Sequence, residues 1–227
     1  MRAGTDAGTG AGPITLRADA VLFDSDGVLV DSHARVLTAW AELARRFGLD
    51  FEAMSDEIAG VPADAILRRH LPATDVDDAV ATLEDLEVAA AAATTPIAGA
   101  TDLLLGLPTD RWAIVTSASR RLATARWSAA GIPATHVVTA DDVVDGKPHP
   151  EPFLRAAAAL GVEASRCVVF EDSAAGAVAA EAAGATIVAV GDRPWAVPPA
   201  ARVPDLESVT ITVDPVAADG PLTVVVG

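Results

Sequence analysis

The sequence contains a single cysteine, Cys167, among its 227 residues, and it can therefore form no internal disulfide. Cys167 lies in the apolar run RCVVF, where a buried core residue is a simpler interpretation than a nucleophile. No apolar run approaches the roughly 20 residues that a membrane-spanning helix needs, and residues 1–13 contain no apolar signal-peptide segment. We therefore expect a cytoplasmic protein with no membrane partner.

Positive charge is also scarce, since 16 Lys and Arg residues against 32 Asp and Glu residues give a net charge of −16. Nucleic-acid binding needs a basic face, so we expect no nucleic-acid partner. A small anionic ligand would be repelled only within about 8 Å at physiological salt, because counterions screen longer distances. Local cations in a binding site must then decide whether such a ligand binds.

Short apolar runs alternate with Ala-rich segments of helical length, and both suggest an α/β fold. Segments 121–131 and 151–161 each end at a glycine suited to a helix C-terminus. The apolar runs have the length and composition of buried parallel strands, at residues 18–24, 111–117, 135–140, 166–172 and 185–191. The pattern predicts a doubly wound parallel sheet with helices on both faces. The alternating stretches 208–214 and 221–227 are predicted as edge strands.

Residues 25–110 separate the first two predicted strands, far more chain than one crossover helix requires. Within that interval, segments 33–48, 63–71 and 76–93 have apolar positions at helical spacing. We therefore predict a helical bundle, the cap (residues 33–96), inserted into a core domain (residues 14–32 and 97–227). The junctions near 30–32 and 94–99 are expected to be hinges. Residues 1–13 are predicted to be a disordered tail.

Two acidic residues follow the first predicted strand in the segment DSDGVLVDS, residues 24–32. Asp24 and Asp26 are two apart on an extended backbone and therefore point the same way, and Gly27 permits a turn. Ligands of open parallel sheets bind beyond the carboxyl ends of the strands, so this pair is predicted to lie in a site. The alternative is that Asp24 caps a helix and Gly27 only makes a turn.

A second acidic pair, Glu171 and Asp172, ends another predicted strand in the string VVFEDSAAG. Adjacent carboxylates repel each other unless a cation lies between them, and Mg²⁺ prefers such hard oxygen ligands. The two pairs together therefore predict a magnesium site. Helix capping by Asp172 or Ser173 is the alternative, but it does not explain both pairs.

Two further strand ends offer groups that bind anions. The segment TSAS, residues 116–119, supplies hydroxyls and backbone amides at a predicted helix N-terminus. The segment GKPHP, residues 146–150, holds Lys147 in a loop restrained by two prolines. For Lys147 taken alone, a solvated surface lysine remains an alternative.

The strings DSDGVLVDS, TSAS, GKPHPEPF and FEDSAAG occur in the order and approximate spacing of the four motifs of the haloacid dehalogenase superfamily. The resemblance covers residues 18–192, and the insert resembles the helical cap of the branch with sugar phosphatases, phosphoglycolate phosphatase and β-phosphoglucomutase. It implies a Rossmann-like core with an inserted all-helical cap domain. It also implies a phosphatase that hydrolyses a small organic phosphate through an aspartyl-phosphate intermediate.

By this resemblance, Asp24 would be the nucleophile and Asp26 the general acid and base. Ser117 and the neighbouring backbone amide of Ala118 would hold the phosphoryl oxygens. Lys147 would neutralise both the nucleophile and the phosphate.

The same resemblance implies a Mg²⁺ ion held by Asp24, Asp172 and the backbone carbonyl of Asp26. Glu171 would contact the metal through water or from just outside its ligand sphere.

The same residues distinguish a phosphatase from related activities of the superfamily. Dehalogenases of this superfamily lack the second motif aspartate, so Asp26 favours phosphate chemistry. Phosphomutases of the β-phosphoglucomutase type have a hinge histidine and a cap arginine at the positions that correspond here to Val36 and Ala63, while His33 is interpreted as a lone surface histidine. We therefore predict a phosphatase acting on a sugar or polyol phosphate. A phosphomutase and a non-catalytic phosphate-binding protein remain alternatives, and a monomer or weak dimer is expected.

Overall fold

The computed structural model describes residues 12–55, 58, 62–195, 197–213 and 220–227. Its centre is a six-stranded sheet in which every neighbouring pair is parallel. In order across the sheet, the strands are β6 (Val137–Val138), β5 (Trp112–Val115), β2 (Ala20–Phe23), β7 (Cys167–Glu171), β8 (Thr186–Val190) and β9 (Ala201–Val203). The predicted doubly wound parallel sheet is confirmed, and each of the five predicted runs contains one of these strands.

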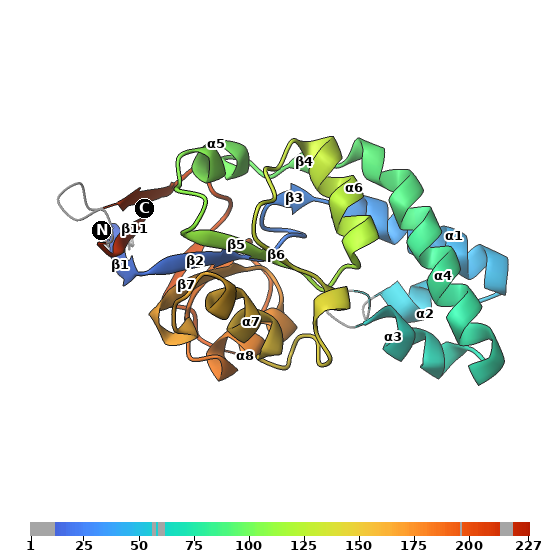
Figure 1. The fold of residues 1–227 in the computed structure, drawn as a ribbon. Coiled ribbons are helices and arrows are strands. Elements are labelled where there is room, and N and C mark those ends of the chain that lie inside the picture. Colours follow the sequence, from blue (N-terminus) through green and yellow to red (C-terminus); the bar gives the residue numbers. More distant parts are fainter. Residues whose placement is uncertain (1–11, 56–57, 59–61, 196, 214–219) are drawn as a thin grey trace, which may run out of the picture.

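Helices cover both faces of this sheet (Figure 1). One face carries α5 (Ala100–Leu105) and α6 (Arg120–Ala130), and the other carries α7 (Glu151–Ala159) and α8 (Ala174–Ala182). Short 3₁₀ turns occur at Ala140–Asp142 and Ala164–Arg166. Successive side chains of β2 enter opposite apolar clusters, Val21 and Phe23 on the α5 and α6 face, and Ala20 and Leu22 on the other. Because strand side chains alternate, a strand buried on both faces reads as the continuous apolar run seen in the sequence.

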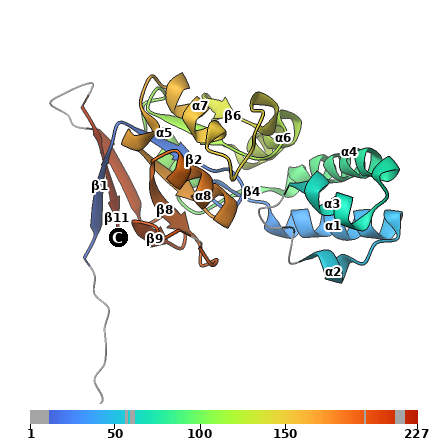
Figure 2. The same cartoon turned by 90° about the horizontal axis from the view of Figure 1, so that it is seen from below.

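A separate antiparallel sheet lies at the end of the core far from the cap (Figure 2). Its order is β1 (Ile14–Ala18), β11 (Leu222–Val226) and β10 (Val209–Val213). The C-terminal stretches are therefore strands, but the expectation that both are edge strands is wrong for β11, which is central. The reason is β1, a strand that the sequence analysis did not identify, because most of its side chains are not buried.

The described chain of the cap is helical between the two linker strands β3 (Val30–Asp31) and β4 (Thr95–Pro96). Its elements are α1 (His33–Phe47), α2 (Phe51–Ser55), α3 (Ala63–His70), α4 (Ala73–Ala90) and a 3₁₀ turn at Ala91–Ala93. They enclose an apolar cluster of their own that includes Leu43 and Leu67, and Figure 2 shows them as a lobe beside the core. The helix α2 was not predicted.

The two linkers between core and cap pair with each other as a short antiparallel sheet, with Val30 opposite Pro96. The predicted hinges and the domain boundaries at residues 32/33 and 96/97 stay predictions. Most of the predicted disordered tail, residues 1–11, lies outside the described residues. In the described part of the chain, no helix has the length and apolar character needed to cross a membrane.

The neighbouring residues Leu104 and Leu105 of α5 provide a test of this packing. Leu104 is 2 % exposed and faces the core, whereas Leu105 is 69 % exposed. We expect Leu104→Ala to lower the free energy of unfolding by about 2–5 kcal/mol, because the truncation leaves a cavity. Leu105→Ala should change it by about 0.5 kcal/mol or less. Urea denaturation of both variants checks this, and equal losses would contradict the assigned orientation of α5.

Candidate active site

Two acidic segments meet at the carboxyl ends of the neighbouring strands β2 and β7. Phe23 and Phe170, the residues before each segment, are in register, and their rings stack with centroids 5.2 Å apart. Asp24 and Glu171 are buried, and 13 % of the Asp172 side chain is exposed. One carboxylate oxygen of each of the three lies within 4.8 Å of the others. The structure thus brings together three of the acidic residues that the sequence assigned to one site.

Lys147, the only lysine in the chain, lies at the centre of this acidic cluster. Its side chain is 4 % exposed, and its Nζ lies 2.5 Å from Asp24 Oδ1 and 2.8 Å from Glu171 Oε2. It also donates to the backbone carbonyl of Val115 at 3.0 Å. All three ammonium protons therefore have acceptors. The alternative of a solvated surface lysine is wrong, because the loop carries this side chain into the sheet edge.

Crowding and burial shift the ionisation of the acidic cluster. Burial raises the pKa of Asp24 well above its ordinary value, Glu171 raises it further, and Lys147 offsets part of the shift. Burial followed by the Glu171 carboxylate raises the pKa of Asp172 to about 7. Burial alone would lower the pKa of Lys147, but Asp24 and Glu171 outweigh it and raise that pKa above its ordinary value. Two of the three carboxylates, Asp24 and Glu171, thus share one ammonium, and a divalent cation would relieve the repulsion that remains in the cluster.

Two glycines leave room for these carboxylates. Gly27 has a φ of 85°, and a Cβ there would lie 2.2 Å from Asp172 Oδ2. A Cβ on Gly176, in the first turn of α8, would lie 2.0 Å from the Glu171 carboxylate carbon. Ser173 caps α8 by accepting from the Gly176 amide and donates to Glu171 Oε1 at 2.7 Å. Helix capping is therefore done by Ser173, while Asp172 faces the cluster.

Asp26 lies in the turn after β2, but its side chain has different partners from those of Asp24. Its Oδ1 accepts from Ser32 Oγ at 2.5 Å and from Arg126 Nη1 at 2.9 Å. Its side chain is 29 % exposed, and within the described residues Oδ2 accepts no hydrogen bond. One oxygen is thus held and the other is open to a ligand, which suits the predicted exchange of a proton.

The segment TSAS forms the loop between β5 and α6, as predicted. Ser117 is exposed to the cavity that Asp24 and Lys147 also line. The Ala118 amide donates to Thr116 Oγ1 at 3.1 Å, and Ser119 caps α6 by accepting from the Leu122 amide. The predicted phosphate-binding groups therefore surround the cavity, but the Ala118 amide would have to exchange its partner to bind a phosphoryl oxygen.

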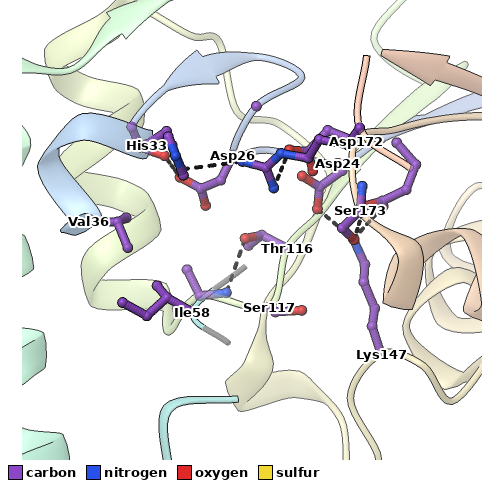
Figure 3. Close-up of a pocket in the computed structure, with 15 residues that line it drawn as sticks. Asp24, Asp26, His33, Val36, Ile58, Thr116, Ser117, Lys147, Asp172 and Ser173 are labelled. Carbon is purple, nitrogen blue, oxygen red and sulfur yellow. Dashed lines mark hydrogen bonds and ion pairs between the residues drawn. The ribbon is translucent and has the colours of Figure 1, made fainter. Parts of the chain in front are cut away.

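The acidic cluster opens into a cavity of about 170 Å³ whose lining is shown in Figure 3. A second cavity of about 410 Å³ shares Asp26, Ser117 and Lys147 with it and extends between the core and the cap. Val36, Trp40 and Leu83 belong to the cap side of its lining. A ligand with one end at Lys147 could therefore place its other end against the cap.

Residues 18–184 match the family model of the haloacid dehalogenase-like hydrolases. The chain belongs to this family. Hexitol phosphatase A of Escherichia coli K12 is 39 % identical over 212 residues, which are 88 % of this chain and 97 % of the relative. Glycerol-1-phosphate phosphohydrolase 2 of Saccharomyces cerevisiae is 31 % identical, over 78 % of this chain and 76 % of the relative.

Among solved structures, a haloacid dehalogenase family hydrolase from Deinococcus radiodurans R1, with bound phosphate and sodium, matches with a TM-score of 0.60. The two sequences are 29 % identical, and the match covers 82 % of this chain and 90 % of the Deinococcus chain. Together, the family match and these relatives identify the protein as a phosphatase. It is a phosphoric monoester hydrolase that acts on a small organic phosphate.

The site of this haloacid dehalogenase-like hydrolase also contains charged residues that the sequence analysis did not identify. Arg193 Nη1 lies 3.4 Å from Asp172 Oδ2, and Nη2 lies 3.3 Å from His33 Nδ1. Arg193 follows the strand at 185–191, so the strand-end argument could have found it. Arg126 lies inside a helix, where its sequence context resembles that of a surface arginine.

Replacement of Gly27 tests whether the turn leaves room for Asp172. We expect Gly27→Ala to weaken Mg²⁺ binding at least about tenfold, because the new Cβ displaces one carboxylate ligand. The control is Gly131→Ala at the end of α6, where φ is 67° and no neighbouring atom of the described residues would lie within 4 Å of an added Cβ. Both variants lose about 1–2 kcal/mol to the left-handed backbone conformation. Calorimetric titration with Mg²⁺ separates them, and equal affinities would disprove the packing role of Gly27.

Proposed function

We propose that this protein is a Mg²⁺-dependent phosphatase of sugar or polyol phosphates that forms an aspartyl-phosphate on Asp24. The observation that carries the proposal is the buried cluster of Asp24, Glu171 and Asp172 around Lys147, at the mouth of a cavity that extends to the cap. A cluster with surplus negative charge at the carboxyl edge of a parallel sheet suits a cation and a phosphate together.

The carboxylates fit Mg²⁺ in donor type, because all are hard oxygen ligands within reach of one another. Asp24 and Asp172, with the backbone carbonyl of Asp26, would hold the ion, and Glu171 would contact it indirectly. When bound, Mg²⁺ supplies positive charge that offsets the repulsion between a carboxylate and a phosphate dianion.

The residues of the chain divide the chemistry between two steps. In the first, Asp24 attacks phosphorus while Lys147 neutralises charge and Ser117 holds a phosphoryl oxygen. Asp26 passes a proton to the departing alkoxide through its open oxygen. In the second step, Asp26 takes a proton from water, which hydrolyses the aspartyl-phosphate and releases inorganic phosphate. Such proton transfer typically contributes about 10²- to 10⁴-fold to the rate.

The lining of the larger cavity suits the binding of a neutral leaving group. Its cap side presents apolar groups of Val36, Trp40 and Leu83, on which the carbon face of a polyol can pack. Glu87 and Arg126 supply polar atoms nearby. The names of the relatives, which include hexitol phosphatase and glycerol-1-phosphate phosphohydrolase, agree with such substrates.

The described lining of the larger cavity does not favour the phosphomutase alternative. A mutase must hold a second phosphate with a cationic side chain. Among the described residues that line the larger cavity, the cationic side chains are Arg126 and Lys147, and both are paired with carboxylates. Val36 and Ala63 line the cavity but can grip no phosphate.

Hydrolysis of a panel of phosphate esters by the wild type and by Asp24→Asn tests the proposal and the non-catalytic alternative together. We expect phosphate release that EDTA abolishes and Mg²⁺ restores, with sugar and polyol phosphates preferred. Asp24→Asn should be folded but lower kcat by at least about 10³-fold, because an amide is a poor nucleophile. Full activity after exhaustive chelation would refute the metal site. Substantial turnover by Asp24→Asn, with deamidation excluded by mass spectrometry, would refute the nucleophile.

The second prediction of this mechanism concerns Asp26→Ala. It should lower kcat/KM for a sugar phosphate by about 10²-fold or more, because the alkoxide leaves without a proton. The loss for p-nitrophenyl phosphate should be much smaller, with a burst of nitrophenol before slow turnover, because hydrolysis of the intermediate also needs Asp26. Rapid mixing detects the burst. Equal losses for both substrates would exclude the acid role.

A further inference from the structure

A buried arginine connects Asp26 with the cap. The Arg126 side chain, on α6 of the core, is 5 % exposed. Its Nη1 contacts Asp26 Oδ1 at 2.9 Å, and its Nη2 contacts Glu87 Oε1 on α4 of the cap at 3.2 Å. Buried arginines need such pairing, and the planar guanidinium can serve two carboxylates in different directions. One side chain thus joins the predicted general acid to the other domain.

The core end of this connection is fixed by the packing of α6. Trp127, the next residue, is 4 % exposed in the apolar core, and its Nε1 donates to Ser25 Oγ at 2.9 Å. Two successive residues of α6 therefore hold two successive residues of the turn, Ser25 and Asp26. The backbone of α6 is therefore fixed by the core. The Arg126 guanidinium can still change position by rotation of its own side chain, and its partner in the cap restrains that rotation.

That partner, Glu87, is itself nearly buried, with 13 % of its side chain exposed. Burial raises the pKa of Glu87, and the Arg126 charge offsets part of that shift. A second ion pair joins the same two helices at their surface, between Arg121 Nη2 and Asp85 Oδ1 at 2.7 Å. Those side chains are 55 % and 66 % exposed. The two helices thus share a buried pair that reaches Asp26 and an exposed pair that does not.

We propose that Arg126 is a positioning residue that leaves one oxygen of Asp26 open for proton transfer only while Glu87 of the cap holds its second nitrogen. The inference rests on the proposed phosphatase mechanism. An isolated pair of a guanidinium and a carboxylate favours a bidentate contact, which would engage both oxygens of Asp26. With Glu87 in place, Arg126 contacts Oδ1 alone and Oδ2 remains free. Protonation of the leaving group thus requires the docked cap.

Glu87→Ala and its matched control Asp85→Ala test the inference, since each removes one arginine partner from α4. The substrates are p-nitrophenyl phosphate and phenyl phosphate, which have similar shapes but differ in how much the departing oxygen needs a proton. We expect Glu87→Ala to lower kcat/KM, which reports the transfer of phosphate to Asp24, by about ten- to a hundredfold for phenyl phosphate and by less than about threefold for p-nitrophenyl phosphate. Asp85→Ala should stay within about twofold for both.

Two results would overturn the inference. One is an equal loss of kcat/KM for both substrates in Glu87→Ala. The other is a loss of kcat/KM in Asp85→Ala as large as that in Glu87→Ala. Either result would reflect the docking of the cap alone. Arg126→Lys adds a check, since one ammonium cannot hold both carboxylates in the same way. It should show the leaving-group dependence of Glu87→Ala, and circular dichroism should confirm that it is folded.

A double-mutant cycle measures the connection without any turnover. Melting-temperature shifts of Asp26→Asn and Glu87→Ala should be non-additive, because both carboxylates share one guanidinium. The shifts of Asp26→Asn and Asp85→Ala should add. An inactive wild type would therefore refute the proposed function, whereas an additive Asp26 and Glu87 cycle would refute the connection.

Discussion

Mutual repulsion among three largely buried carboxylates is the constraint on which the rest of the structure depends. Asp24, Glu171 and Asp172 meet because β2 and β7 are adjacent and parallel. Burial makes their charge more costly than in water, so the site needs the ammonium of Lys147 and a place for a further cation. Gly27, which has no Cβ, then leaves the space in the turn that the Asp172 side chain occupies.

The same constraint separates the two aspartates of the first segment. Asp24 is held among acidic groups and paired with Lys147, an arrangement that a cation can turn into an ionised nucleophile. Asp26 is only two residues further along the chain, but it contacts Arg126 and Ser32 outside the cluster. Neighbouring carboxylates with different partners can perform different chemistry, one as a nucleophile and one as a carrier of protons.

The sequence predicted the sheet and the acidic cluster because both follow from local patterns: buried strands read as apolar runs, and the ends of parallel strands meet at one edge. Features that depend on distant partners escaped it. The strand β1 pairs with β11 some two hundred residues away, and few of its side chains are buried. Arg126 and Glu87 are single charges within helices, and only tertiary packing distinguishes them from solvated residues. The pairing of the Ala118 amide with Thr116 is equally invisible in a motif.

The scarcity of lysine gives the cluster a further property. A phosphate ester approaches a protein of net charge −16, and salt limits the range of that repulsion to about 8 Å. Within the described site, the cations are Lys147, which Asp24 and Glu171 already engage, Arg193, which contacts Asp172, and Arg126, which contacts Asp26 and Glu87. None of them is surplus to the carboxylates. Under the proposed function, net attraction for a dianion would come from a bound cation, so phosphate affinity and metal affinity would be linked in this site, each strengthening the other.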